Sequence, residues 1–535
     1  MRRRWILFPI NPFHAPSTTT MRDRRESLSL PSDDDLQSTF YLNFDHPDAI
    51  DDSKLSTAFT NLRRMKSVEQ VELSNLRQEM PHLPQLQLAL AINFCPRVTK
   101  ISFVNCVVNN LESLYLAVAE KGELASLQFR SCQFSGDAAS TLQAALLSNT
   151  IGALVFDRCK FEEGSCEIIA SGVRQNNTLK RLYFIDLKYS ASMHLNDSLQ
   201  ETFSCTNLVE LGLMLGRTRS KTDGSIFRCM EPLQRLTKLS LNCSRIDLQS
   251  MKGLMQLSSA VNSLTTLVFS ASIDQNAMEF MVMTLSTNNI IDNLNLEHVR
   301  LANGRNFNVS CGSLHVQKLN LSDLCFDGPS FVQTMEQMAD NQFIQSLHCP
   351  NLEEEEVEKI CDVFLRPNRG PSELVLKDFH EFDFMIIDEL RRNMSVQSLT
   401  VRLLEPEELT SFARGLTHMS LRKLTFGCRN GSYLEYTKDF FEALQQSMEH
   451  NRTLSYLTLY SLHADNEYAK QYLPLIRYNL TLNRVGRHSL IDAHVPVGIW
   501  PHILAHTSNE ADGIYFVLTG KPELVTPSRK RKDRD

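Results

Sequence analysis

One repeated pattern, L-x-x-L-x-F, constrains most of this 535-residue chain. It is clearest in LASLQFRSCQF, residues 124–134, and its fifteen copies have a mean period of about 27.6 residues. The fourth and sixth positions are apolar in every copy, although only 42% of the chain is apolar, so the pattern is not a chance result. The copies start at Val68, Val98, Leu124, Ile151, Leu179, Leu208, Leu236, Leu264, Ile291, Val316, Ile344, Pro371, Val396, Leu421 and Leu454.

Each copy combines two periodicities. Apolar residues at positions four and six alternate with residues at three, five and seven, which is typical of a short strand with one buried face. Helical spacing follows: residues 135–150 place Ala138, Leu142 and Leu146 on one stripe, and residues 328–343 do the same with Met335 and Met338. One unit alone cannot bury both its strand face and its helix face, so stacked units are predicted.

The predicted fold is an α/β solenoid with a parallel β-sheet on the concave side, helices on the convex side and about 15–16 repeats. LxxLxFxxCxF at 124–134, with its period of 26–29 residues, resembles leucine-rich repeats of the ribonuclease-inhibitor-like subclass. The segment STFYLNFDHP supplies a degenerate first strand, with Leu42 and Phe44 at the apolar positions. Most units lack the Asn or Cys that this subclass carries at position nine, which makes the turn less regular in the second half.

Four segments are expected. Residues 1–38 form a disordered leader, rich in Arg, Ser and Thr, that permits organelle import as an alternative to a location in the cytoplasm or nucleus. The solenoid spans 39–465, a helical C-terminal cap spans 466–525, and the chain closes with a basic disordered tail, 526–535. Four consecutive basic residues in this tail, at 529–532, fit a nuclear-import patch or a solvated terminus.

Three cysteines at the ninth position of consecutive units raise the question of a metal or redox site. Cys106, Cys132 and Cys159 fall one strand spacing apart in the predicted stack, so they form a line and not a tetrahedron. A small side chain with a weak S–H donor suits the turn after a strand, where it meets backbone carbonyls. We therefore interpret the three thiols as a structural seam.

The sequence indicates no catalytic or cofactor chemistry. His488, His494, His502 and His506 are the strongest metal-like cluster, but no HExxH motif, thiolate pair or acidic ligand accompanies them, and packing histidines are the preferred interpretation. Neither GxSxG nor a phosphate-binding GxxxxGK[ST] loop is found, and glycine is scarce. We expect no enzyme, no metal, no cofactor and no small-molecule substrate.

A surface remains as the candidate site. Residues at positions three, five and seven of each strand point to the concave face, where Arg and Tyr are the residue types that anchor protein contacts. An ordinary solvated sheet face would show a similar mixture. The candidate partner-binding residues are Arg130, Asp157, Arg181, Tyr183, Tyr456 and Tyr460.

The predicted function is a non-enzymatic, intracellular protein-interaction scaffold with a partner that the sequence does not identify. The net charge of −7, with both signs well mixed, disfavours nucleic acid as the partner, and no apolar segment is long enough to span a membrane. Two alternatives remain open. One is the recognition subunit of a ubiquitin-ligase or signalling complex, and the other is a Ran-type GTPase-activating protein, which uses the same repeat but should carry a catalytic arginine and an acidic tail.

Overall fold

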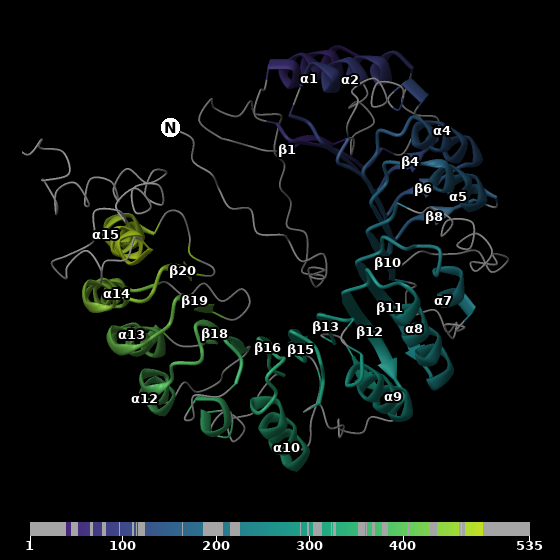
Figure 1. The fold of residues 1–535 in the computed structure, drawn as a ribbon. Helices are drawn as coiled ribbons and strands as arrows, with labels where there is room; N and C mark the ends of the chain where they lie inside the picture. Colours follow the sequence, from purple (N-terminus) through teal and green to yellow (C-terminus); the bar gives the residue numbers. More distant parts are fainter. Residues whose placement is uncertain are drawn as a thin grey trace, which may run out of the picture.

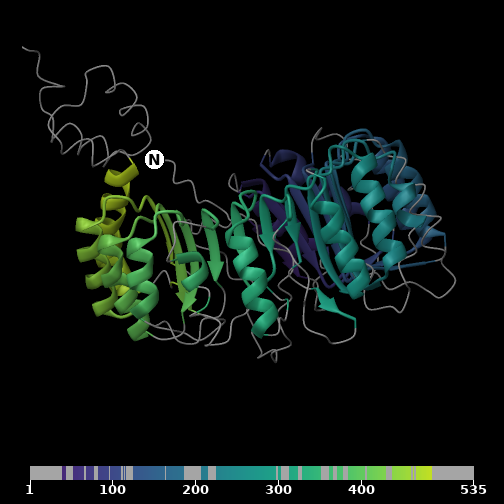
Figure 2. The same cartoon turned by 60° about the horizontal axis from the view of Figure 1, so that its bottom comes forward.

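The computed structural model describes residues 39–484, apart from internal gaps of which the longest are 186–206, 215–224 and 303–312; residues 1–38 and 485–535 lie outside the described part. Strands and helices alternate along the chain and build a curved solenoid, with the strands on the inner side and the helices on the outer side (Figure 1). Seen after a turn of the molecule, the strands lie side by side and the helices stack outside them (Figure 2). The predicted fold class is confirmed.

Among the described residues, the main sheet has seventeen strands, all paired in parallel, and sixteen of them belong to successive repeats. A second parallel sheet has three short strands, each of which comes directly after the turn that ends a repeat strand in three early repeats. The repeat strands are β1 (Thr39–Asn43), β2 (Gln70–Ser74), β3 (Lys100–Val104), β5 (Ser126–Arg130), β7 (Ala153–Asp157), β9 (Arg181–Ile185), β10 (Glu210–Met214), β11 (Lys238–Ile246), β12 (Thr266–Ile273), β13 (Asn293–Asn295), β15 (Lys318–Asn320), β16 (Ser346–His348), β17 (Glu373–Leu376), β18 (Ser398–Leu403), β19 (Lys423–Cys428) and β20 (Tyr456–Leu459). The short strands are β14 (Arg300–Leu301), β4 (Val107–Val108), β6 (Gln133–Phe134) and β8 (Lys160–Phe161).

Helices connect the strands on the convex side. The α-helices are α1 (Asp52–Arg64), α2 (His82–Phe94), α4 (Gly136–Leu147), α5 (Ser165–Gln175), α7 (Ser225–Cys229), α8 (Leu248–Ala260), α9 (Gln275–Leu285), α10 (Gly328–Ala339), α12 (Phe384–Arg392), α13 (Pro406–Gly415), α14 (Lys438–His450) and α15 (Glu467–Arg484). The described part of the chain also contains a π-helical turn, η2 (Cys361–Leu365), and a 3₁₀ turn, η3 (Leu416–His418).

The apolar positions of the repeat form one continuous core. In β5, Leu127 and Phe129 are buried while Gln128 is half-exposed and Arg130 is exposed, as the alternating pattern predicts. The predicted stripe of α4 is also buried, from Ala138 to Leu146. Core residues contact one another without interruption from the first repeat to the last helix, so stacking buries what no single unit could bury.

Aromatic rings reinforce the early part of this core. Phe103, Phe129, Phe156 and Phe184 occupy the sixth position of four consecutive units and stack with centroid distances of 5.1 to 5.6 Å. Phe134 packs edge-on against two of them. Burying a phenylalanine side chain contributes about 1.5–3 kcal/mol, and aromatic pairs in these geometries add to that. The column therefore fixes the strand register of the first repeats.

The first strand differs from its prediction by two residues. Phe40 and Leu42 pair with Val71 and Leu73 of β2, so they hold the fourth and sixth positions that we assigned to Leu42 and Phe44. Leu42 is buried as predicted, but at the sixth position. A two-residue shift keeps the same face of a strand toward the core, which is why the apolar pattern alone could not distinguish the two registers.

Buried asparagines join four of the helix ends to the preceding repeat. Asn341, Asn393 and Asn451 each donate from Nδ2 to a carbonyl one repeat earlier, and each Oδ1 accepts the backbone N–H groups two and three residues later. Asn176 makes the same set of contacts. These asparagines therefore serve as cross-links between repeats.

The helix predicted after residue 466 is α15, and it stacks as the preceding helices do. The rings of Phe441 and Tyr472 lie parallel at 6.3 Å, and the Tyr472 hydroxyl donates to Glu442 at 2.8 Å. Asn483 donates to the carbonyls of Asn451 and Leu454, one repeat earlier. The remainder of the predicted cap, 485–525, the leader 1–38 and the basic tail lie outside the described residues.

Candidate functional site: the concave sheet face

The concave face consists of three rows of side chains, formed by the third, fifth and seventh positions of the strands. Because the parallel strands are in register, each position continues from one strand to the next: Tyr183 of β9 lies between Val155 of β7 and Gly212 of β10. The same registers place Arg130 opposite Asp157 and Arg181 opposite Glu210. Residues about one repeat apart in sequence are therefore direct neighbours on this face.

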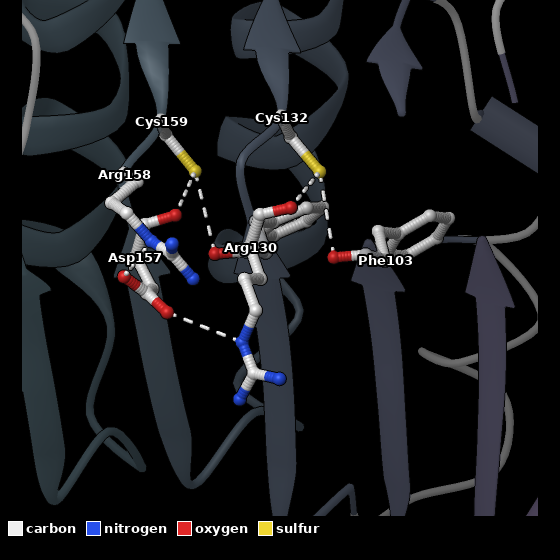
Figure 3. A network of polar contacts seen from close by, with 7 residues as sticks. Phe103, Arg130, Cys132, Asp157, Arg158 and Cys159 are labelled. Atoms are coloured by element: carbon white, nitrogen blue, oxygen red, sulfur yellow. Dashed lines mark hydrogen bonds and ion pairs between the residues drawn. The ribbon is translucent and has the colours of Figure 1, made fainter. Parts of the chain in front are cut away.

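The three thiols lie behind this face, as predicted for a structural seam. Cys106, Cys132 and Cys159 are at most 2% exposed. Each Sγ donates to two backbone carbonyls, one in its own repeat and one in the preceding repeat; for Cys132 these are Arg130 and Phe103, both at 3.4 Å (Figure 3). The neighbouring Cys132 thiol and burial raise the pKa of Cys106, which keeps this donor protonated.

A metal centre finds no support in the described part of the chain. No group of three or more His, Cys, Asp or Glu side chains there is arranged to hold a metal ion. The four histidines that formed the metal-like cluster in the sequence, His488, His494, His502 and His506, lie outside the described residues. Thiols that donate to carbonyls are protonated, whereas metal ligation requires thiolate.

Charged side chains form a small network at the seventh position of β5 and β7. Asp157 accepts from Arg130 Nε and from Arg158 Nε, both at 3.2 Å (Figure 3). Asp157 is 19% exposed, whereas the two arginine side chains are about half exposed. Exposed ion pairs contribute at most about 1 kcal/mol to stability. The network therefore serves mainly to hold the carboxylate and Arg130 in one arrangement.

Tyr183 lies flat on the neighbouring strand. Gly212 is its partner on β10, and a Cβ at that residue would overlap the Tyr183 ring. The Tyr183 hydroxyl donates to the Glu210 carboxylate at the third position of the same strand. Burial and this carboxylate raise the pKa of Tyr183, so the phenol stays neutral. The ring is thereby fixed in a single orientation on the concave face.

The structure brings four of the six predicted residues together. Arg130, Asp157, Arg181 and Tyr183 lie on three consecutive strands, β5, β7 and β9. We call this group, with Glu210 and Gly212 of β10, the β5–β10 patch. Tyr456 lies at the far end of the sheet, on β20, with the Arg484 guanidinium 5.6 Å from its ring centre, and Tyr460 lies outside the described residues.

Sequence reasoning missed Arg158, Glu210 and Gly212. Aligning the repeats puts Gly212 at the fifth position, next to Tyr183, so this glycine was a readable signal. Arg158 was hidden because it lies at the eighth position, where its φ of 53° is left-handed. Asn75, Asn105 and Ser131 share that conformation at the same position, and the turn directs the Arg158 side chain to Asp157.

The repeat, the parallel concave sheet and the outer helices define a leucine-rich-repeat solenoid. A scan against protein-family models and a search of curated proteins find no match. Among solved structures, the chain is similar to one titled "Crystal structure of TLR13-ssRNA13 complex", with 12% identity and a TM-score of 0.32, covering 76% of this chain and 64% of that chain. The chain thus spans less than two thirds of that structure's length. No helix in the described part is long and apolar enough to cross a membrane.

Proposed function

We propose that this protein is a non-enzymatic interaction scaffold that binds a protein partner on its concave sheet face. The observation that carries the proposal is the fixed Tyr183 ring, supported from below by Gly212 and held at its hydroxyl by Glu210. Arg130 stands two strands away, held by Asp157. The period and the outer helices support the ribonuclease-inhibitor-like subclass as the form of the repeat.

Preorganisation is the physical reason to favour this patch over the rest of the face. Immobilising a free side chain on binding costs about 0.5–1.5 kcal/mol, and the contacts of Tyr183 and Arg130 meet part of that cost before a partner arrives. Tyr and Arg are also the residue types that most often dominate binding energy at protein interfaces. A partner that covers the β5–β10 patch would bury both side chains at once.

The experiment compares a charge-reversing double variant of the patch with a matched convex control. Arg130→Glu with Tyr183→Ala removes both anchors, and Arg174→Glu with Tyr468→Ala makes the same changes on α5 and α15, where both residues are exposed. Full-length wild type and both variants are used to capture proteins from cells, and the affinity of each captured protein is then measured in purified form.

Loss of an interface hot spot costs about 2 kcal/mol or more, which is roughly a thirtyfold loss of affinity. We expect that loss for the patch variant and less than about a twofold change for the control, with unchanged circular dichroism for both. If the patch variant binds the same proteins with wild-type affinity, the β5–β10 patch is not the binding site.

A further inference from the structure

The third-position row of the concave face runs in continuous register across most of the sheet. Arg181 lies opposite Glu210 on the next strand, and Glu210 lies opposite Lys238 on the strand after that. The same pairing continues from Lys238 to Tyr456 through Thr266, Asn293, Lys318, Ser346, Glu373, Ser398 and Lys423. The predicted site residues Arg181 and Tyr456 therefore lie on one line and are not separate features. The same line extends back through β7 and β5 to Lys100 of β3, three strands before Arg181.

This row is basic in a protein that is acidic as a whole. Five cations stand at the third position, Lys100, Arg181, Lys238, Lys318 and Lys423, against two carboxylates, Glu210 and Glu373. The chain carries a net charge of −7. Within the described part of the chain, none of the five cations has a carboxylate oxygen within 4 Å. We call these five residues the cationic row.

Two further observations describe the surroundings of the cationic row. The pKa of Lys100 is lowered by burial and by the nearby charge of Arg130, and Glu72 offsets this only in part. The adjacent fifth-position row contains no Lys, Arg, Asp or Glu from β3 to β20; Ser, Gln, Val, Asn and Thr predominate, and His348 is its one histidine. A line of cations thus borders a neutral strip, and an approaching anion meets no charged competitor in that strip.

Resting on the proposed function, we propose that the partner presents an extended acidic polypeptide segment, which lies along the concave arc with its carboxylates on the cationic row. Opposite potentials steer association and fix the register of a complex. The neutral fifth-position row then faces the backbone and uncharged side chains of the segment, and Tyr183 contacts it near one end.

Strand spacing sets the length and pattern of this segment. Twelve strand spacings of about 4.8 Å separate β3 from β19, which makes the row about 58 Å long. An extended chain advances about 3.3 Å per residue, so about 17 residues span the row. The gaps between successive cations are three, two, three and four spacings, which corresponds to an acidic residue at every third to sixth position of the partner.

The same surface is less suited to single-stranded nucleic acid. Binding of that kind relies on successive aromatic platforms on which bases stack. From β3 to β20 the fifth-position row contains Tyr183 as its only Phe, Tyr or Trp, and its hydroxyl is already engaged by Glu210. Glu210 and Glu373 within the row also repel a continuous phosphate backbone, whereas a peptide with spaced carboxylates avoids them.

The test measures fluorescence anisotropy of labelled probes with the full-length protein at moderate ionic strength. Three peptides of about 18 residues carry Glu, Gln or Lys at every fourth position in a Ser/Thr/Gly background, and a labelled oligouridylate of similar length is the fourth probe. Lys238→Glu with Lys318→Glu reverses two charges of the row outside the β5–β10 patch. The control variant, Lys160→Glu with Arg174→Glu, reverses two exposed charges outside the concave sheet. A milder row variant, Lys238→Gln with Lys318→Gln, removes the two charges without reversing them, so that an effect of lost charge is distinguished from misfolding.

We expect the Glu peptide to bind at least about tenfold more tightly than the Gln and Lys peptides. Lys238→Glu with Lys318→Glu should lower the affinity for the Glu peptide by about tenfold or more, and Lys238→Gln with Lys318→Gln should lower it by less. The control variant should change this affinity by under about twofold. Equal binding of Glu and Gln peptides, no binding of any peptide, or full retention by the row variant overturns the inference. Tighter, row-dependent binding of the oligouridylate also overturns it. If captured partners depend on Arg130 and Tyr183 but the Glu peptide does not bind, the inference fails while the proposed function stands.

Discussion

At the scale of single residues, the concave face owes its one fixed aromatic ring to a glycine. Tyr183 lies over Gly212 because no Cβ occupies that space, and Glu210 on the same strand accepts its hydroxyl hydrogen. Neither contact gives much stability alone, because a single hydrogen bond contributes about 0.5–1.5 kcal/mol. Together they decide which way the ring points, and that matters more for binding than for folding.

Gly212→Ala should displace the Tyr183 ring and break its hydrogen bond to Glu210. We expect a loss of about 1–3 kcal/mol in the free energy of unfolding, measured by urea denaturation, and weaker binding of any partner that depends on Tyr183. Gly136→Ala is the control, because nothing lies within 4 Å of a Cβ at that residue in α4. It should be neutral or stabilising by up to about 1 kcal/mol. Equal effects of the two substitutions would contradict the proposed role of Gly212.

Sequence reasoning succeeded for residues whose role depends on position within a repeat. Cys132 was assigned to the seam from its ninth position, and its thiol does contact two carbonyls. The sequence placed Tyr183 on the concave face but did not reveal its contact with Gly212. The orientation of the ring depends on the residue at the same position one repeat later. Position in a repeat is encoded locally, whereas side-chain direction is set by the neighbouring strand.

At the scale of elements, buried asparagines connect successive repeats at the ends of several helices. Asn176 is 1% exposed; its Nδ2 donates to the Leu146 carbonyl, and its Oδ1 accepts the N–H groups of Thr178 and Leu179. Main-chain groups at helix ends lack partners within the helix. The asparagine satisfies such groups in two repeats, so it fixes the angle between the helix and the next strand.

Asn176→Ala should therefore destabilise far more than the same change one residue later. Loss of a buried partner leaves each abandoned polar group unsatisfied, at about 1–3 kcal/mol per group, so we expect a total loss of about 2–4 kcal/mol in the free energy of unfolding. Asn177 is exposed, and Asn177→Ala should change the same quantity by less than about 0.5 kcal/mol. Thermal and urea denaturation of the two variants provide the comparison. Similar losses in both would show that the asparagine contacts between repeats carry little energy.

The strand register was predicted correctly where the apolar pattern allows one register and wrongly where it allows two. The fifteen repeats starting from Val68 keep the predicted strand register. In the first strand, Phe40, Leu42 and Phe44 alternate without interruption, so two registers bury the same face. Pairing with β2, through Leu42 and Leu73, selects the earlier one; this choice depends on packing between repeats and not on the strand itself.

At the scale of the whole molecule, the solenoid converts scattered residues into continuous rows. Lys100, Arg181, Lys238, Lys318 and Lys423 are 57 to 105 residues apart from one to the next in the sequence, yet stacking of the repeats aligns them along one face. Because each repeat contacts mainly its neighbours, the surface is long and preformed. The repeat predicted this architecture; the partner could not be predicted, because the same fold presents many different surfaces.

Site-specific photocrosslinking in cells tests the central claim, that the concave face is the binding surface. One repeat offers a matched pair: Val268, half-exposed on the concave strand β12, and Met283, 61% exposed on the convex helix α9. A photoreactive residue is placed at each site in the full-length protein, and crosslinked proteins are identified by mass. We predict specific adducts from residue 268 that are absent from residue 283 and that the patch variant Arg130→Glu with Tyr183→Ala abolishes. Adducts from residue 283 with none from residue 268 would contradict the account.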